Sequence, residues 1–249
     1  MLLTLKVLDI SARILLGLIV TYLVATVSEV LLHRYIAHAS SKARRYWARH
    51  PRLFGHLLKL HYRHTIVHHG LTFRMNHVTQ FKDTNEKELT DRIVALRTDE
   101  LIHREDYGLT IGLRGLISYN MTVAPILPIL YWLAGPWALF GALPVLTLAP
   151  LSAMLLHPFL HEHHETTRRP SAMVQLLMST RYYRMLWSHH FVHHKYPNSN
   201  FNLLLGGDFL LGTYRRPDPS DLAEMEEVGM PLGLATFRPE GAVDCMEGS

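Results

Sequence analysis

Two long apolar runs dominate the pattern of hydrophobic and polar positions along the chain. The first, Ile14 to Leu32, holds Glu29 as its only charged residue. Its length matches the roughly 20 residues that an α-helix needs to cross the hydrocarbon layer. The run ends in charged and histidine residues, not at a small-residue cleavage site. The pattern therefore predicts a retained transmembrane anchor and not a signal peptide.

The second run, Leu116 to Leu156, contains no charged residue in 41 positions, about twice the length of one span. Gly135-Pro136 in its middle is a turn signal. The run is therefore expected to fold as a hairpin of two membrane helices, about Leu116 to Ala134 and Trp137 to Leu156. A hairpin returns the chain to the side that it left, so the polar segments before and after it are expected on one side of the membrane.

The remaining segments have weaker patterns. Lys82 to Tyr107 is charged and polar without heptads, which predicts a surface excursion. Ala172 to Trp187 is amphipathic and compatible with a helix lying at the membrane interface. Residues 1–215 are expected to form a single membrane-embedded domain, and residues 216–249 a polar, loosely ordered tail.

Composition limits the chemistry. Histidine is the outlier, with 18 residues against 21 Asp and Glu together. The single cysteine, Cys245, excludes an internal disulfide and a thiolate metal site, so any bound metal must be held by nitrogen and oxygen. The net charge is +4, but 15 of the 25 Lys and Arg lie between Arg34 and Arg114, mixed with eight acids and directly after an apolar run. The positive-inside rule accounts for this placement better than nucleic-acid binding does.

Ten histidines fall into four clusters, each just beyond or close to an apolar run: His33/His38, His64/His68/His69, His157/His161 and His190/His193/His194. Histidines four apart, such as His64 and His68, lie on one face of an α-helix. His33 and His38 are five apart and converge only if the helix frays or tightens. Because the hairpin brings all four clusters to one side, and one site needs three or four protein ligands, ten histidines predict two metals.

Residues beside the clusters are expected to be alternative ligands or to orient the ligands: His61, His163, His164, His189 and Asp208. Four other histidines fit no cluster and are expected to be ordinary polar residues: His50, His56, His77 and His103. Asn200 and Asn202 are expected to support the loop after the last cluster. Glu29, the one acid inside the first span, is expected to hydrogen-bond a ligand such as His33.

The motifs favour oxidation over hydrolysis. A zinc hydrolase normally keeps a general-base glutamate, as in HExxH, and no HExxH occurs here; residues 161–165, His-Glu-His-His-Glu, have the wrong spacing. A redox pair of irons that activates dioxygen needs no such glutamate. The site then mainly has to position a C–H bond and exclude water.

The chain resembles the integral-membrane fatty acid hydroxylase and sterol desaturase superfamily over about residues 14–215. The resemblance rests on the following motifs: His33-x4-His38 after a span, His64-x3-His68-His69, His157-x3-His161, His190-x2-His193-His194, Asn200-Phe201-Asn202 and Asp208-Phe209-Leu210-Leu211-Gly212-Thr213. The second cluster departs from the pattern, because many hydroxylases have x2 before the histidine pair. Membrane desaturases and alkane hydroxylases also use x3, so the departure leaves the reaction outcome open.

The resemblance implies an all-α integral membrane enzyme of about three transmembrane helices, with a cytosolic helical cap holding two iron ions through the ten clustered histidines. It implies hydroxylation of a lipid or other apolar acyl-type substrate with dioxygen as co-substrate, and desaturation as the alternative. Zinc can occupy such sites in a purified protein. No haem- or flavin-binding module is visible, so electrons are expected from a separate protein of ferredoxin or cytochrome b5 type. The pairs Arg44-Arg45 and Arg168-Arg169 would dock that carrier or anchor the chain to membrane lipids, with anchoring favoured.

A metal-binding or transport protein is the alternative from another class. Transporters usually place ionisable residues within their spans, whereas the run from 116 to 156 has none, so transport is disfavoured. The clusters are expected on the cytoplasmic side. The lack of a lysine-based retrieval signal at the C-terminus favours a bacterial inner membrane over the endoplasmic reticulum.

Overall fold

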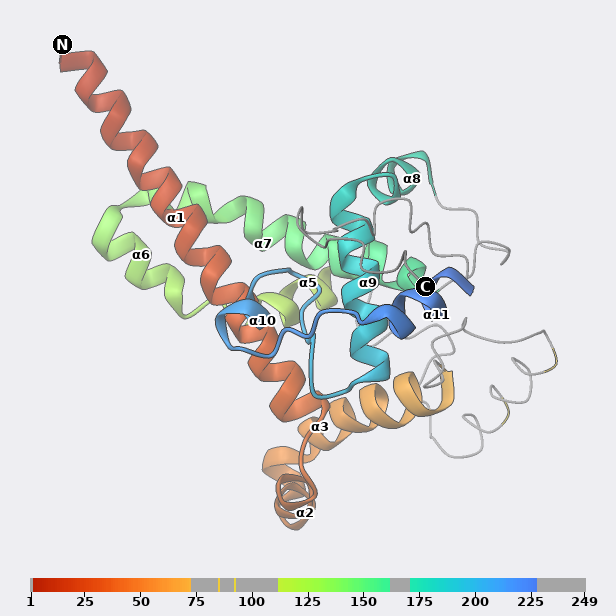
Figure 1. The fold of residues 1–249 in the computed structure, drawn as a ribbon. Helices are drawn as coiled ribbons and strands as arrows, with labels where there is room; N and C mark the ends of the chain where they lie inside the picture. The colour runs from red at the N-terminus through yellow and green to blue at the C-terminus, as the bar shows by residue number, and fades with distance from the viewer. Residues whose placement is uncertain (1, 73–84, 86–91, 93–111, 162–170, 228–249) are drawn as a thin grey trace, which may run out of the picture.

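The computed structural model describes residues 2–72, 85, 92, 112–161 and 171–227, and these contain helices and no strand. The prediction of an all-α fold is confirmed for this part of the chain (Figure 1). The predicted surface excursion, apart from residues 85 and 92, lies outside the described residues.

The longest helix, α1, runs from Leu2 to Leu32 and continues into a π-helical turn, η1, over His33–Ala37. Together, Thr4–Ala37 is long and apolar enough to cross a membrane. Many of its apolar side chains after Arg13 face outward; Leu15 is 54% and Ile19 is 48% exposed. An exposed apolar surface of this kind suits contact with lipid. The predicted anchor lies inside this helix.

The second helix that meets the same criteria is α7, Pro136–Leu156. It crosses α1 at very close range, because glycines remove the side chains at the contact. A Cβ atom added to Gly17 would overlap the carbonyl of Ala138, and one added to Gly141 would overlap the carbonyl of Ile14. Small residues allow this kind of backbone approach between membrane helices.

The first arm of the predicted hairpin is not one continuous helix. It is divided into α5, Leu113–Asn120, and α6, Ile126–Ala134. Pro125 has no N–H to donate and disfavours α-helical geometry at the residue before it, which explains the break. The described residues therefore hold two candidate membrane-spanning helices, where the sequence predicted about three.

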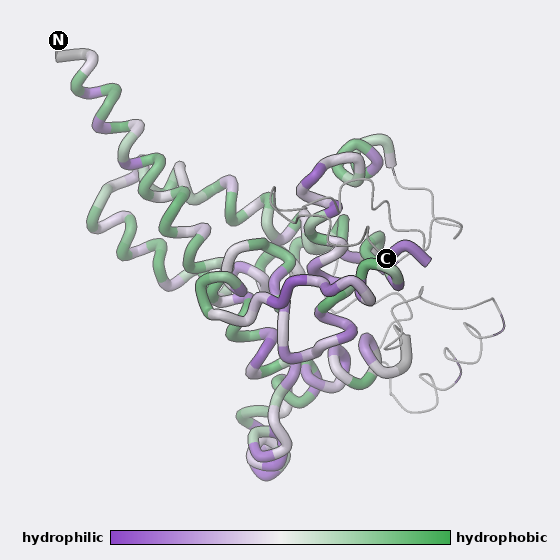
Figure 2. Tube along the Cα trace, in the orientation of Figure 1, coloured by the Kyte–Doolittle hydropathy of each residue, from purple (hydrophilic) through white to green (hydrophobic). Residues whose placement is uncertain are grey.

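Beyond α1, the chain forms α2, Ser41–Arg49, and α3, Pro51–His61, and then a second π-helix, η2, Tyr62–Thr72. The hydroxyl of Ser40 accepts a hydrogen bond from the N–H of Ala43, which caps α2. These elements lie at the end of α1 opposite the N-terminus (Figure 1). Figure 2 shows that α1, α6 and α7 are mostly hydrophobic and that hydrophilic positions gather toward α2, α3 and α9.

After α7, a 3-10 turn, η3, covers His157–Leu160. The predicted amphipathic helix is divided into α8, Ala172–Met178, and α9, Arg181–Lys195. The hydroxyl of Thr180 accepts from the N–H of Tyr183 and so starts a new helix at the break. The inner side of α9 forms the largest hydrophobic cluster, with Trp187, Phe191 and other buried residues. A short helix, α10, Gly207–Leu210, then packs against α1.

The segment predicted as a loosely ordered tail begins with α11, Pro219–Glu227. Met225 is fully buried in the cluster around α9, and Asp221 forms a buried ion pair with Lys195, Nζ to Oδ1 2.7 Å. This part of the predicted tail is therefore an ordered helix. Its polar composition concealed the two apolar residues, Met225 and Leu222, and the ion pair that hold it. Residues 228–249 lie outside the described part.

Candidate metal centre

Nine of the ten clustered histidines form two groups. Site 1 consists of His33, His38, His64, His69 and His193, and site 2 of His68, His161, His190 and His194. Within each group the ligand nitrogens lie within 4.8 Å of one another. The tenth histidine, His157, lies against site 2, with its Nε2 3.1 Å from that of His190 and 3.2 Å from that of His161. The fold thus brings together all ten residues that the sequence singled out, and their role as ligands stays a prediction.

Two π-helices supply site 1 with histidines five residues apart. In η1 the N–H of His38 donates to the carbonyl of His33 over 2.9 Å. Because i→i+5 hydrogen bonds widen the turn, residues five apart stand roughly above one another. His64 and His69 in η2 have the same spacing and also share site 1. His64 and His68 are neighbours as expected, with ring centroids 5.1 Å apart, but they belong to different groups.

Both η2 and α9 contribute to the two sites at once. His68 from η2 and the pair His190 and His194 from α9 belong to site 2, whereas His193 from α9 belongs to site 1. The sites are adjacent, because the rings of His69 and His194 stack with centroids 4.1 Å apart. This arrangement could hold two neighbouring ions, with η2 and α9 contributing histidines to both groups.

The nitrogen separations fit a bound ion. Two nitrogens at about 2.1 Å from a common ion lie about 3.0 Å apart at a right angle and about 3.4 Å apart at a tetrahedral angle. In site 1, Nε2 of His64 lies 2.7 Å from that of His33 and 3.0 Å from that of His69. In site 2, Nε2 of His190 lies 2.8 Å from that of His161 and 3.1 Å from that of His194. The distances in both groups agree with ligands converging on one ion.

Backbone carbonyls fix the tautomer of two site 1 histidines. Nδ1 of His33 lies 2.5 Å from the carbonyl oxygen of Phe201, and Nδ1 of His193 lies 2.8 Å from that of Ser199. A carbonyl can only accept, so each Nδ1 carries the proton and each Nε2 keeps its lone pair. This is the usual arrangement behind a metal-binding histidine.

The site keeps its histidines neutral. Burial, followed by repulsion from His33 and His61, lowers the pKa of His38 to about 3. Burial together with neighbouring imidazoles also holds the pKa well below the ordinary value in five more histidines: His64, His68, His190, His193 and His194. Neutral imidazole is the form that binds metal, so near pH 7 protons compete little for these nitrogens.

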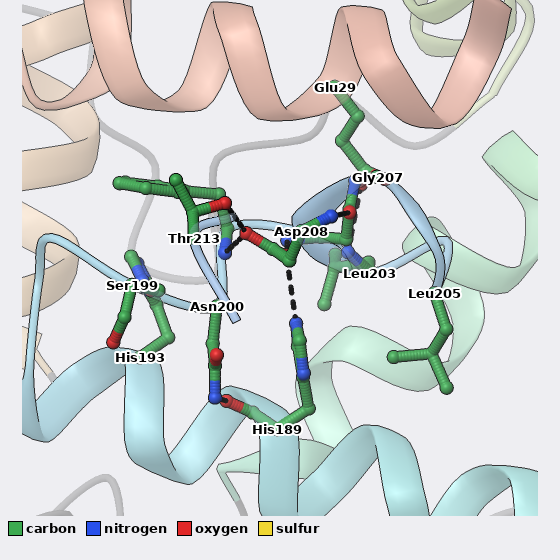
Figure 3. Close-up of polar contacts among 12 residues, drawn as sticks. Glu29, His189, His193, Ser199, Asn200, Leu203, Leu205, Gly207, Asp208 and Thr213 are labelled. Atoms are coloured by element: carbon green, nitrogen blue, oxygen red, sulfur yellow. Dashed lines mark hydrogen bonds and ion pairs between the residues drawn. The ribbon is translucent and has the colours of Figure 1, made fainter. Parts of the chain in front are cut away.

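His189 and Asp208 belong to neither group and instead bind each other, with Nε2 3.0 Å from Oδ2 (Figure 3). Asp208 is fully buried and also accepts from Phe201 N–H, Asn202 N–H and the Thr213 hydroxyl. Burial alone would raise the pKa of Asp208, but the hydrogen bonds from His189 and Thr213 outweigh it and lower that pKa. Asp208 is thus an ionised acceptor at the centre of the loop after α9.

Glu29 contacts the same loop and not His33, contrary to the expectation. Leu203 N–H donates to its Oε1 over 3.1 Å and Leu204 N–H to its Oε2 over 2.9 Å. His33 already bonds the carbonyl of Phe201, so the link between Glu29 and His33 runs through the loop.

Sequence reasoning missed Tyr22 and Thr26. Tyr22 donates to the carbonyl of Leu205, and Thr26 donates to that of Leu204 over 2.6 Å. With Glu29 they form a polar stripe at i, i+4 and i+7 on the mostly apolar second half of α1. That spacing was the signal that could have revealed them.

The other residues named from the sequence lie outside the two groups or outside the described residues. His61 bonds the carbonyl of Ala37 through Nδ1 at 2.7 Å. His50 and His56 are exposed. Asn200 adopts a left-handed φ of 54° and its Oδ1 accepts from Arg215 N–H, which shapes the loop. The rest lie outside the described residues: His77, His103, His163 and His164.

Comparisons with models of protein families, with curated proteins and with solved structures give no match. What the chain does must therefore be inferred from the centre and the apolar helices. Buried groups of neutral histidines could bind metal ions, and imidazole suits iron, zinc, copper and nickel.

Proposed function

We propose that the chain is a membrane-bound di-iron oxidoreductase that uses dioxygen to oxidise a C–H bond of a lipid-like substrate. The observation that carries the proposal is the pair of adjacent, all-histidine groups at the end of two apolar helices. Among the described residues, neither group includes a carboxylate that could act as the general base of a zinc hydrolase. Imidazole suits iron as well as zinc, and a pair of irons that activates dioxygen needs no such carboxylate.

The length of α1 supports a centre at the membrane surface. At one end, Arg13 donates to the carbonyl of Ala134 over 3.1 Å, and the exposed Trp132 and Trp137 flank the same turn. Such aromatic residues are typical of the interface. His33 follows Arg13 by 20 residues, a helical rise of about 30 Å, which matches the hydrocarbon thickness. The histidines would then begin where the hydrocarbon ends, within a helical cap on the cytoplasmic side, within reach of a lipid substrate.

The chemistry requires a separate electron donor. Iron bound in the two sites would supply the activation of dioxygen. Hydroxylation converts R–H, dioxygen, two electrons and two protons to R–OH and water; desaturation takes the same inputs and yields a double bond and two waters. The chain itself lowers the pKa of six of the histidines and so favours their neutral, metal-binding form: His38, His64, His68, His190, His193 and His194. It also keeps bulk water away, since His68 and His193 are fully buried.

The test combines metal content with product analysis. Protein purified in detergent without oxygen from iron-57-grown cells should contain two irons per chain by elemental analysis and Mössbauer spectroscopy. With extracted membrane lipid, reduced ferredoxin and dioxygen, it should yield a lipid that has gained one oxygen atom or lost two hydrogen atoms. Tight zinc without iron-supported product formation would instead favour hydrolysis and contradict the proposal.

A further inference from the structure

One loop holds two ligands of site 1 that come from different helices. Through the carbonyls of Ser199 and Phe201, it accepts from His193 on α9 and from His33 at the end of α1. Both ligand rings that these loop carbonyls hold belong to site 1. Beside site 2 the loop bonds the backbone of α9, from Asn200 Nδ2 to the carbonyl of His189.

The shape of this loop depends on Asp208. Its two carboxylate oxygens accept four donors: Phe201 N–H and Thr213 O–H at Oδ1, and Asn202 N–H and His189 Nε2 at Oδ2, over 2.5 to 3.0 Å. Figure 3 shows Asp208 between His189 and the loop. Two of the donors flank the Phe201 carbonyl, so the carboxylate determines where that carbonyl points.

The other side of the loop is tied to α1. Glu29 accepts from two loop N–H groups, and Asn202 Nδ2 donates to the carbonyl of Thr26 over 2.8 Å. Glu29 precedes His33 by one helical turn. The same helix therefore carries a site 1 ligand and an attachment point of the loop that orients it.

We infer that Asp208 is a positioning residue for site 1 alone. It holds the carbonyl of Phe201 directly and that of Ser199 through Thr213, whose hydroxyl donates to Asp208 and whose carbonyl accepts from Asn200 N–H. It thereby fixes the Nδ1 protons of His33 and His193 and aims both Nε2 lone pairs at one ion. This inference rests on the proposed function only in that the two groups bind metal. Mutation of a group that orients a metal ligand typically lowers metal affinity about 10–100-fold. The two sites should consequently differ in their dependence on Asp208.

The test is the Asp208→Asn variant. An amide keeps the shape of the side chain but turns an N–H₂ toward donors, so the loop must shift. At a free ferrous iron concentration that fills both sites of the wild-type chain, equilibrium dialysis should find about one iron on the variant. The second iron should return only at about 10–100-fold higher free iron. Thr213→Val, which removes one of the four donors, should give a smaller shift in the same direction.

Asp221→Asn is the matched control. Asp221 is equally buried but bonds Lys195 and Tyr196 and no histidine, so this variant should keep two irons even if its melting temperature falls. Two irons on Asp208→Asn at the wild-type iron concentration, or equal loss from both sites, would overturn the inference. If Asp208→Asn does not fold, Thr213→Val decides by the same criterion. A wild-type chain that never binds two ions would instead contradict the proposed function.

Discussion

Replacing His193 by alanine should leave one bound iron in place of two and abolish turnover. Nε2 of His193 lies 3.3 Å from that of His38 and 3.2 Å from that of His69, so its loss opens site 1. His190→Ala should open site 2 in the same way. Removing a group that hydrogen-bonds a metal ligand typically lowers metal affinity or activity about 10–100-fold. Removing a ligand itself should therefore lower turnover to below about one-hundredth of wild type. Elemental analysis and product formation measure both effects.

Double variants test the grouping directly. His64 and His69 belong to site 1 and His68 to site 2, so His64→Ala/His69→Ala should keep one iron and His64→Ala/His68→Ala should keep none. An α-helix over η2 would pair His64 with His68 and predict the reverse. The two double variants remove the same number of histidines, so they control for each other.

His50→Ala is the single-site control. This exposed side chain packs at a tilt against Tyr46, with ring centroids 4.8 Å apart, and belongs to neither group. It should keep two irons and full turnover. Loss of iron from His50→Ala, or one iron retained by His64→Ala/His68→Ala, would show that the grouping is wrong.

The sequence predicted which histidines come together but not how they divide between two sites. The spacing of the histidines beside the apolar runs identifies the clusters. The hydropathy pattern alone indicates that the clusters lie on the same side of the membrane. The division depends on the i→i+5 register of η1 and η2, which no simple pattern of side chains reveals. His33 and His38 converge in the structure because their turn widens, where the sequence suggested fraying or tightening.

The sequence also could not predict the long-range polar contacts. Glu29 and Asp208 are 179 residues apart, and both hold the same loop. The apolar run identified Glu29 as an unusual intramembrane acid. It could not identify the backbone N–H groups that donate hydrogen bonds to Glu29. The broken helices have local causes instead: Pro125 lies at the break inside the first arm of the hairpin, and Thr180 caps a new helix inside the amphipathic segment.

Gly17→Leu should force α1 and α7 apart and prevent stable folding. Even a single Cβ atom at this position would overlap the backbone carbonyl of Ala138, and a backbone cannot rotate away as a side chain can. The loss in free energy of unfolding should exceed the roughly 1–3 kcal/mol typical of overpacking a protein core. Because α1 leads to His33 and α7 to His157, separation should also lower iron at both sites. Thermal unfolding in detergent and iron content provide the measurements.

Gly55→Ala is the matched control on α3. A Cβ atom there meets nothing within 4 Å, so alanine should stabilise the helix by about 0.5–1 kcal/mol. Gly141, the other glycine at the contact between α1 and α7, adds a second test. Once Gly17→Ala has separated the helices, the Cβ of Gly141→Ala no longer meets the carbonyl of Ile14, so the double variant should cost less than the sum of the single ones. Wild-type stability in Gly17→Leu, or strict additivity in the double variant, would contradict direct backbone contact between α1 and α7.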